Sequence, residues 1–207
     1  MQLRYETGLS GERYVTAQAW REARLERCPN HPRGGCSLAR HGTYGRKTPR
    51  GARVARWYCP QSHATFSLLP DCLAARLPGT LDALEEAVAA AERAPSLAAA
   101  ADAIRRDAVE LPGAVRWLRR RVRLVRNALN AAIGLVPDRL APCAPSIAAV
   151  RGRLGSDGAL TALRALAAPQ LRQLPAPLGF HPRRPAATDR NGVPQHRMGR
   201  DPPPAAA

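Results

Sequence analysis

Two short pairs of metal-binding side chains stand out in this 207-residue chain. The first is Cys28-Pro-Asn-His31, the second is Cys59-Pro-Gln-Ser-His63, and 27 residues separate them. Each pair is short enough to sit on one tight turn, and one tetrahedral Zn²⁺ can join two such turns. The spacing therefore predicts a small zinc ribbon, folded by a structural zinc, with the ligands Cys28, His31, Cys59 and His63.

One position in this ligand set is open. Cys36 is the main rival, because Gly34-Gly35 would let the backbone fold back so that the Cys36 thiolate replaces His31. The alternative to a metal site is that Cys28 and Cys59 are small buried residues and that the His side chains are exposed. Five Cys, an odd number, fit a reducing compartment with metal better than a disulfide framework, so we expect a cytoplasmic protein.

The charge of the chain favours an anionic partner. The formal net charge is +16, and Lys47 is the only lysine among the basic residues. Every charged side chain between the two ligand pairs is basic, and release of counterions from phosphates drives the binding of such segments to nucleic acid. A GC-rich genome, however, inflates Arg, Ala, Pro and Gly together. The distribution of the charge must therefore decide between the two explanations.

Periodicity predicts a mainly α protein with a small β zinc ribbon. We expect a strand or turn over Leu3–Gly8, a helix over Arg13–Glu26, and strands over Arg53–Tyr58 and Thr65–Leu69. Capping residues and helical spacing predict helices over 81–94, 97–107 and 112–133, the last ended by Gly134, and weaker helices over 145–174. The expected units are an N-terminal helical lead-in (1–26), the ribbon (27–72), a helix-turn-helix-like block (73–134), C-terminal helices (135–178) and a disordered tail (179–207).

The third of these helices carries one-sided charge. At about 100° per residue, its apolar residues fall in one sector, and the adjacent sector holds only Arg and Asn: Arg116, Arg119, Arg120, Arg123, Arg126, Asn127 and Asn130. Residues 112–131 contain six Arg and no acid, whereas residues 80–102 contain five acids and one Arg. Codon bias does not separate charges in this way, so this helix is predicted to face phosphate and bases.

The preceding helix completes a helix-turn-helix pattern. Ser96–Asp107, a break near Val109–Leu111 and the Arg-rich helix follow one another at the spacing of that motif, whose second helix enters the major groove. Arg can read guanine through two hydrogen bonds, and Asn can read adenine in the same way. The alternative is an amphipathic pair of helices in a bundle.

Residues 27–131 resemble the amino-terminal region of bacterial insertion-sequence transposases, in which a zinc ribbon precedes a helix-turn-helix. The matching segments are Cys28-Pro-Asn-His31, Arg40-His-Gly-Thr-Tyr-Gly-Arg46, Ala55-Arg-Trp-Tyr-Cys59 and Ala64-Thr-Phe-Ser-Leu-Leu-Pro70. The chain departs from the family in having His where each knuckle usually has a second Cys, and in a second knuckle that is one residue longer. The resemblance implies a stand-alone DNA-binding protein of a mobile element.

The sequence does not predict an enzyme. The roughly 75 residues after the Arg-rich helix are poor in Asp and Glu, so they cannot supply the metal-binding carboxylates of a recombinase. The chain has neither a Gly-x-Ser-x-Gly elbow nor a phosphate-binding loop that ends in Lys-Ser/Thr. No apolar run approaches the roughly 20 residues of a membrane span.

We therefore expect a zinc-containing protein that binds duplex DNA. The predicted contacts are Arg40, Arg46, Lys47, Arg53 and Arg56 in the ribbon, and Arg116, Arg119, Arg120, Arg123 and Asn127 in the helix. The alternative is an adapter that binds another protein, such as a transposase, through the ribbon and helices. RNA is a third option, but few aromatic residues are available for single-strand stacking.

Overall fold

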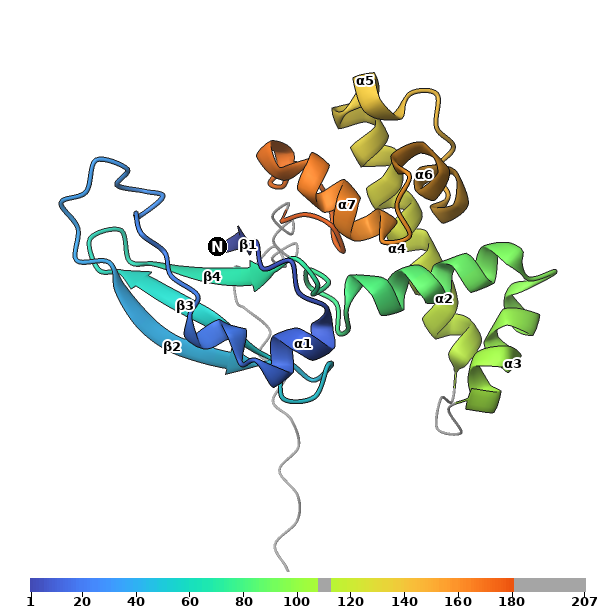
Figure 1. Cartoon of the computed structure of the whole chain (residues 1–207), viewed down its shortest axis with the longest axis horizontal. Coiled ribbons are helices and arrows are strands. Elements are labelled where there is room, and N and C mark those ends of the chain that lie inside the picture. The colour runs from blue at the N-terminus through green and yellow to red at the C-terminus, as the bar shows by residue number, and fades with distance from the viewer. Residues whose placement is uncertain (108–112, 181–207) are drawn as a thin grey trace, which may run out of the picture.

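The computed structural model describes residues 1–107 and 113–180, in which a small sheet lies beside a block of helices (Figure 1). The sheet has four strands in the order β1-β4-β3-β2, with bounds Gln2–Tyr5 (β1), Ala39–Gly45 (β2), Arg53–Cys59 (β3) and Ala64–Pro70 (β4). β2, β3 and β4 form an antiparallel meander, and β1 pairs in parallel with β4. The chain start therefore becomes an edge of the ribbon's own sheet.

The two predicted ribbon strands are confirmed, whereas the predicted helix over Arg13–Glu26 is wrong. That region holds the short helix α1 (Gly11–Thr16) and the 3₁₀ turn η1 (Ala19–Arg21). Gln18 between them has a φ of 49°, and a residue in the left-handed region ends a right-handed helix. The apolar side chains Ala19, Trp20 and Ala23 that suggested a helical stripe are buried.

The next helices agree with the capping signals. α2 spans Leu81–Arg93 and α3 spans Leu97–Asp107, and the hydroxyls of Thr80 and Ser96 accept the backbone N–H of the third residue beyond them. α4 spans Ala114–Leu135. The expected start at Pro112 and the turn at Val109–Leu111 lie outside the described residues.

The expected end of α4 at Gly134 is wrong. The helix continues through Gly134, and the backbone N–H of Val136 still donates to Ala132. Pro137 then opens α5 (Pro137–Leu140), which was not predicted, and Pro is favoured in this first-turn position.

The weakly predicted C-terminal region forms α6 (Ile147–Leu154), α7 (Ala159–Leu166) and the 3₁₀ turn η2 (Ala168–Gln170). The packed chain continues past the expected boundary at residue 178. Phe180 is 7% exposed, and its backbone N–H donates to Leu171 at 2.6 Å. Gly179 fits tightly, since an added Cβ would lie 2.2 Å from the carbonyl oxygen of Leu174. The start of the predicted tail is therefore part of the fold.

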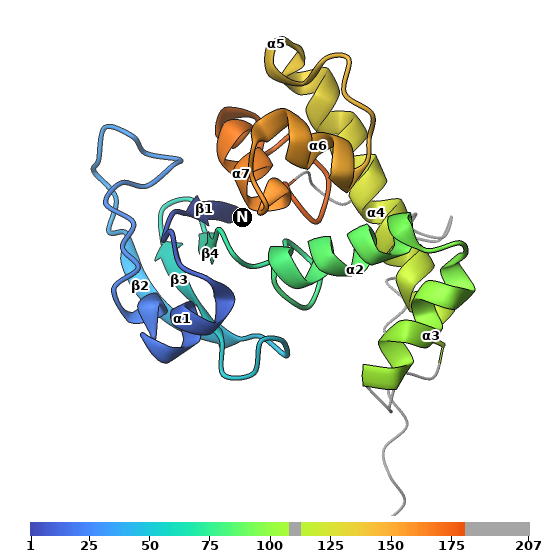
Figure 2. The same ribbon diagram turned by 45° about the vertical axis from the view of Figure 1, so that its right-hand side comes forward.

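The acids of α2 hold the C-terminal helices in place. Glu85, 1% exposed, accepts the first backbone N–H groups of α7, from Ala159 at 3.0 Å and Leu160 at 2.8 Å. Glu92 accepts the N–H of Ile147 at the start of α6 at 3.0 Å. A carboxylate at a helix N-terminus satisfies free donors and complements the helix dipole. α6 and α7 consequently lie along α2 in both views (Figures 1 and 2).

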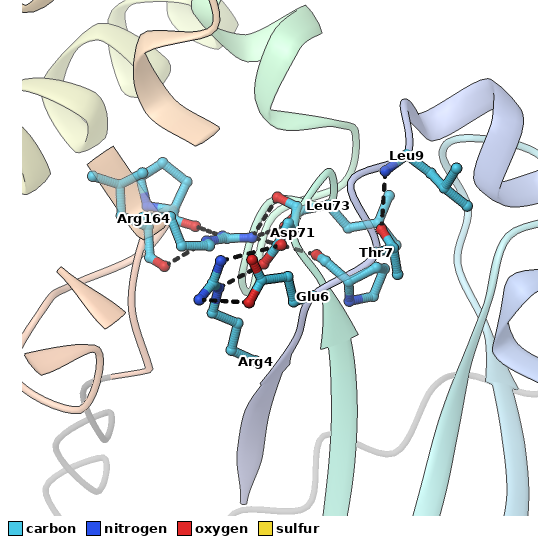
Figure 3. Close-up of polar contacts among 10 residues, drawn as sticks. Arg4, Glu6, Thr7, Leu9, Asp71, Leu73 and Arg164 are labelled. Carbon is cyan, nitrogen blue, oxygen red and sulfur yellow. Dashed lines mark hydrogen bonds and ion pairs between the residues drawn. The ribbon is translucent and has the colours of Figure 1, made fainter. Parts of the chain in front are cut away.

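A buried arginine joins the sheet to the C-terminal segment (Figure 3). Arg164, on α7, is 1% exposed and donates to five backbone carbonyls. Three belong to the end of β4 and the turn after it (Pro70, Asp71, Leu73), and two belong to the C-terminal segment (Pro177, Leu178). Beside it, Arg4 of β1 pairs with Asp71 at 2.8 Å. β1, the end of β4, α7 and residues 177–178 therefore meet at one junction.

Replacing this guanidinium should destabilise the whole protein. Arg164→Met keeps much of the side-chain volume but leaves several buried carbonyls without donors, each costing about 1–3 kcal/mol. We expect the free energy of unfolding, measured by urea denaturation, to fall by at least about 3 kcal/mol. Arg24→Met, at an exposed position, is the control and should change it by less than about 0.5 kcal/mol. Equal stability of the two variants would contradict a structural role for Arg164.

Candidate functional site

Four potential metal ligands converge at the end of the sheet far from the helices. They are Cys28, His31, Cys36 and Cys59, and their ligand atoms all lie within 4.8 Å of one another. Cys28 and Cys59 are buried, whereas His31 and Cys36 are half-buried. The loop that carries the first three lies beyond the free end of the sheet in both views (Figures 1 and 2). Three Cys and one His are a common ligand set of structural zinc sites.

The distances within the group fit a tetrahedral ion. The Nδ1 atom of His31 lies 3.5 Å from the Sγ atom of Cys28 and 3.4 Å from that of Cys59. With Zn–S near 2.3 Å and Zn–N near 2.0–2.1 Å, a tetrahedral site separates sulfur from nitrogen by about 3.6 Å. The group could therefore hold a metal ion, and the softness of three thiolates favours zinc.

Local turns bring these ligands together. The backbone N–H of His31 donates to Cys28 at 3.0 Å, which closes the first turn. Gly34 and Gly35 then adopt φ values of 83° and 81°, a region that favours glycine, and reverse the chain so that Cys36 returns to the group. The side chain of Gln61 donates to the Gly35 carbonyl at 2.7 Å and ties this loop to the second turn.

The thiol of Cys59 is prepared for ionisation. The polar surroundings of the thiol, with the nearby Ser62 first among them, lower the pKa of Cys59 to about 6. Burial and the neighbouring thiols instead raise the pKa of Cys36 to about 11. A thiolate is the form that binds metal, so Cys59 offers a charged ligand near neutral pH.

His63, the predicted fourth ligand, lies outside this group, and Cys36 takes that place. The Nδ1 atom of His63 lies 3.2 Å from the hydroxyl of Tyr58. Tyr58 and Cys59 are successive residues of β3, so their side chains point to opposite faces of the sheet. The extra residue in the second knuckle therefore moves His63 to the wrong face. The alternative ligand set, in which Cys36 replaces His31, also needs correction, because both residues belong to the group.

Two of the predicted phosphate contacts in the ribbon have internal partners. Arg40 donates to the carbonyls of Trp20 and Arg21, both at 2.6 Å. Arg46 donates to the carbonyls of Ala74, at 2.9 Å, and Leu77. These guanidinium groups hold the sheet to η1 and to the turn before α2.

The other basic residues of the ribbon are less constrained. Arg53 is exposed and donates to the Thr43 hydroxyl at 2.7 Å on the neighbouring strand. Lys47 is exposed and Arg56 is half-buried, and within residues 1–107 and 113–180 neither side chain has a hydrogen-bond or ion-pair partner. Lys47, Arg53 and Arg56 therefore remain accessible to an external anion.

The Arg and Asn face of α4 is open to solvent. All of the predicted residues are exposed, namely Arg116, Arg119, Arg120, Arg123, Arg126, Asn127 and Asn130. The opposite side, with Leu118, Val122, Val125 and Leu129, is buried in the main core. In the part of the chain that the structure describes, no carboxylate pairs with an Arg of this face. Four of the acids in the predicted acidic stretch are on α2, where Glu85, Glu86 and Glu92 contact α6 or α7.

α3 packs against α4, as Figures 1 and 2 both show.

The chain matches no protein-family model, no curated protein and no solved structure. Among the described residues, no helix combines the length and the apolar character needed to cross a lipid bilayer.

Substitution of single ligands should identify the metal site. We expect the purified protein to contain about one zinc per chain, bound by the four converging side chains. Cys36→Ser should lose most of this zinc under mild chelation, whereas His63→Ala should keep it, as measured by plasma emission spectrometry. Zinc loss in His63→Ala but not in Cys36→Ser would restore the ligand set predicted from the sequence.

Proposed function

We propose that this chain is a zinc-stabilised protein that binds duplex DNA, with the Arg and Asn face of α4 as its main contact surface. The observation that carries the proposal is the exposure of five Arg and two Asn on one side of α4, without a carboxylate partner among the described residues. A cationic face of this kind repels itself, and a polyanion relieves that repulsion while releasing its counterions.

The packing of the fold supports this choice of face. The apolar side of α4 is already buried, so the charged side is the one that can meet a partner. A helix of 22 residues is long enough to lie in or across a major groove. Arg and Asn are the residues that read guanine and adenine edges there, and α3 beside α4 would take the place of the bracing helix in a helix-turn-helix.

The metal would have a structural role in this proposal. Its four ligands lie in and around the ribbon's far end, and two of them are buried, so an ion there would have no open position for a substrate. We propose zinc as the ion, and a relationship to the stand-alone DNA-binding regions of insertion-sequence transposases as the origin of the ribbon. Lys47, Arg53 and Arg56 would add phosphate contacts on the sheet.

The test is a salt titration of binding to a fluorescent duplex. Arg116→Ala, Arg120→Ala and Arg123→Ala together should preserve the fold, since Ala favours helix at least as much as Arg. If each Arg contacts one phosphate, the slope of log affinity against log salt should become shallower by about 2–3, and affinity should fall at least about tenfold.

A second triple variant controls for total charge. Arg13→Ala, Arg24→Ala and Arg139→Ala remove the same charge from exposed positions on other parts of the molecule. This variant should keep the parent's salt slope. Equal losses in the two triple variants would show that the positive charge acts without a defined surface. Weak, salt-independent binding by the parent would favour the adapter function instead.

A further inference from the structure

A cavity of about 290 Å³ lies beside the Arg face of α4. It forms where the loop after β2 and the start of α2 meet the first turns of α4, and its lining includes Thr48, Pro78, Thr80, Leu84, Trp117 and Arg121. The loop is fixed there, because the backbone N–H of Gly79 donates to Thr48 at 3.1 Å. This volume is near the lower limit for small-ligand pockets. The cavity is therefore built from three segments and is present without a ligand.

One wall of this cavity is a stacked pair of side chains, Trp117 and Arg121. The Arg121 guanidinium carbon lies 3.5 Å from the centre of the Trp117 ring, the geometry of a cation–π pair. Both side chains are half-buried. Across the described parts of the chain, Arg121 has no hydrogen-bond acceptor and no carboxylate partner, and burial lowers its pKa to about 10. A partly desolvated cation without an acceptor favours a ligand that supplies one.

The chemistry of the wall matches a nucleobase. Aromatic rings and guanidinium planes are the surfaces on which unstacked bases stack, and base edges offer carbonyl and ring-nitrogen acceptors to Arg. Pro78 and Leu84 add apolar walls. The Thr80 hydroxyl already accepts the N–H of Ala83, whereas the Thr48 hydroxyl has no partner in the described structure and can bond a base edge.

Cationic side chains near the cavity could bind the phosphates on either side of that base. Arg120 and Arg121 are three and four residues beyond Trp117, so both are its neighbours on the helix surface. Lys47 is exposed and directly precedes Thr48, which lines the cavity. The cavity thus lies between cationic residues of the ribbon and of α4.

We infer that this cavity holds one unpaired nucleobase of a DNA duplex, stacked against Trp117 and Arg121, while Arg120 and Lys47 contact the flanking phosphates. The inference rests on the proposed function and narrows it, because the preferred ligand becomes a duplex with an extrahelical base rather than a fully paired one. Each stacked base contributes enough free energy to raise affinity by about tenfold.

The experiment compares a fully paired duplex with the same duplex carrying one extrahelical fluorescent purine. The parent protein should bind the bulged duplex about tenfold more tightly and should quench the purine. Trp117→Leu and Arg121→Gln should each reduce this preference to near unity. Arg126→Gln is the matched control, since it removes the same charge from the opposite side of α4, and it should keep the preference. The fluorescence of the purine is also measured with the parent protein, so the test does not depend on the stability of Trp117→Leu.

The outcomes separate the two proposals. Equal affinity of the parent for both duplexes, or a preference that survives folded Trp117→Leu, would overturn this inference and leave duplex binding intact. Capture of the bulged probe alone, lost in Trp117→Leu, would support the cavity and overturn general duplex binding. Failure to bind either probe would overturn both. Binding of a free nucleoside monophosphate as tightly as the bulged duplex would also overturn the inference, because the cavity would then be a mononucleotide site.

Discussion

The fold depends on one guanidinium group buried where the end of β4 meets residues 177–178. Five carbonyls from two segments about 100 residues apart point toward Arg164, and only a side chain with several donors can satisfy them together. Its burial is costly and depresses its pKa, but leaving those carbonyls without donors would cost more. The turn that Arg164 holds precedes α2 in the chain. The same contact therefore helps to fix the segment that joins the sheet to the helices.

α2 extends this arrangement and explains the charge distribution. Its carboxylates are used inside the protein, where Glu85 and Glu92 cap α7 and α6 and Glu85 also pairs with Arg151 at 2.7 Å. Three acids of α2, Glu85, Glu86 and Glu92, thus contact α6 or α7. The acids and the Arg residues that are separated along the sequence therefore have different roles. The acids cap helices inside the protein, as the structure shows. The Arg residues form an exposed cationic face, and we propose DNA as the ligand of that face.

Local signals in the sequence predicted the parts of the fold that depend on neighbouring residues. The hydroxyls of Thr80 and Ser96 start α2 and α3, and alternating side chains give β3 and β4. Contacts between distant segments were not predicted. The pairing of β1 with β4 spans more than 60 residues, and the internal hydrogen bonds of Arg46 join segments 28 and 31 residues apart, which no local pattern records. Three of the four candidate metal ligands followed from spacing, and Cys36 was named as a rival ligand because Gly34-Gly35 can reverse the chain. The exclusion of His63 depends on the alternation of side chains along β3, which places it on the face opposite Cys59.

The arrangement also separates stability from recognition. Cys59 ends β3, whereas Arg53 begins it beside the loop that reaches α4, so the metal group and the cavity lie at opposite ends of a strand about 20 Å long. A metal ion at the Cys59 end of β3 would order the Cys-containing loop and fix the register of β3 and β4. It would not contact the proposed DNA surface. The near end has its own anchors, since Arg46 and the hydroxyl of Tyr14 bond backbone carbonyls there. Because those anchors do not involve the metal ligands, metal loss should disorder the far end of the ribbon first and reach the cavity at α4 last.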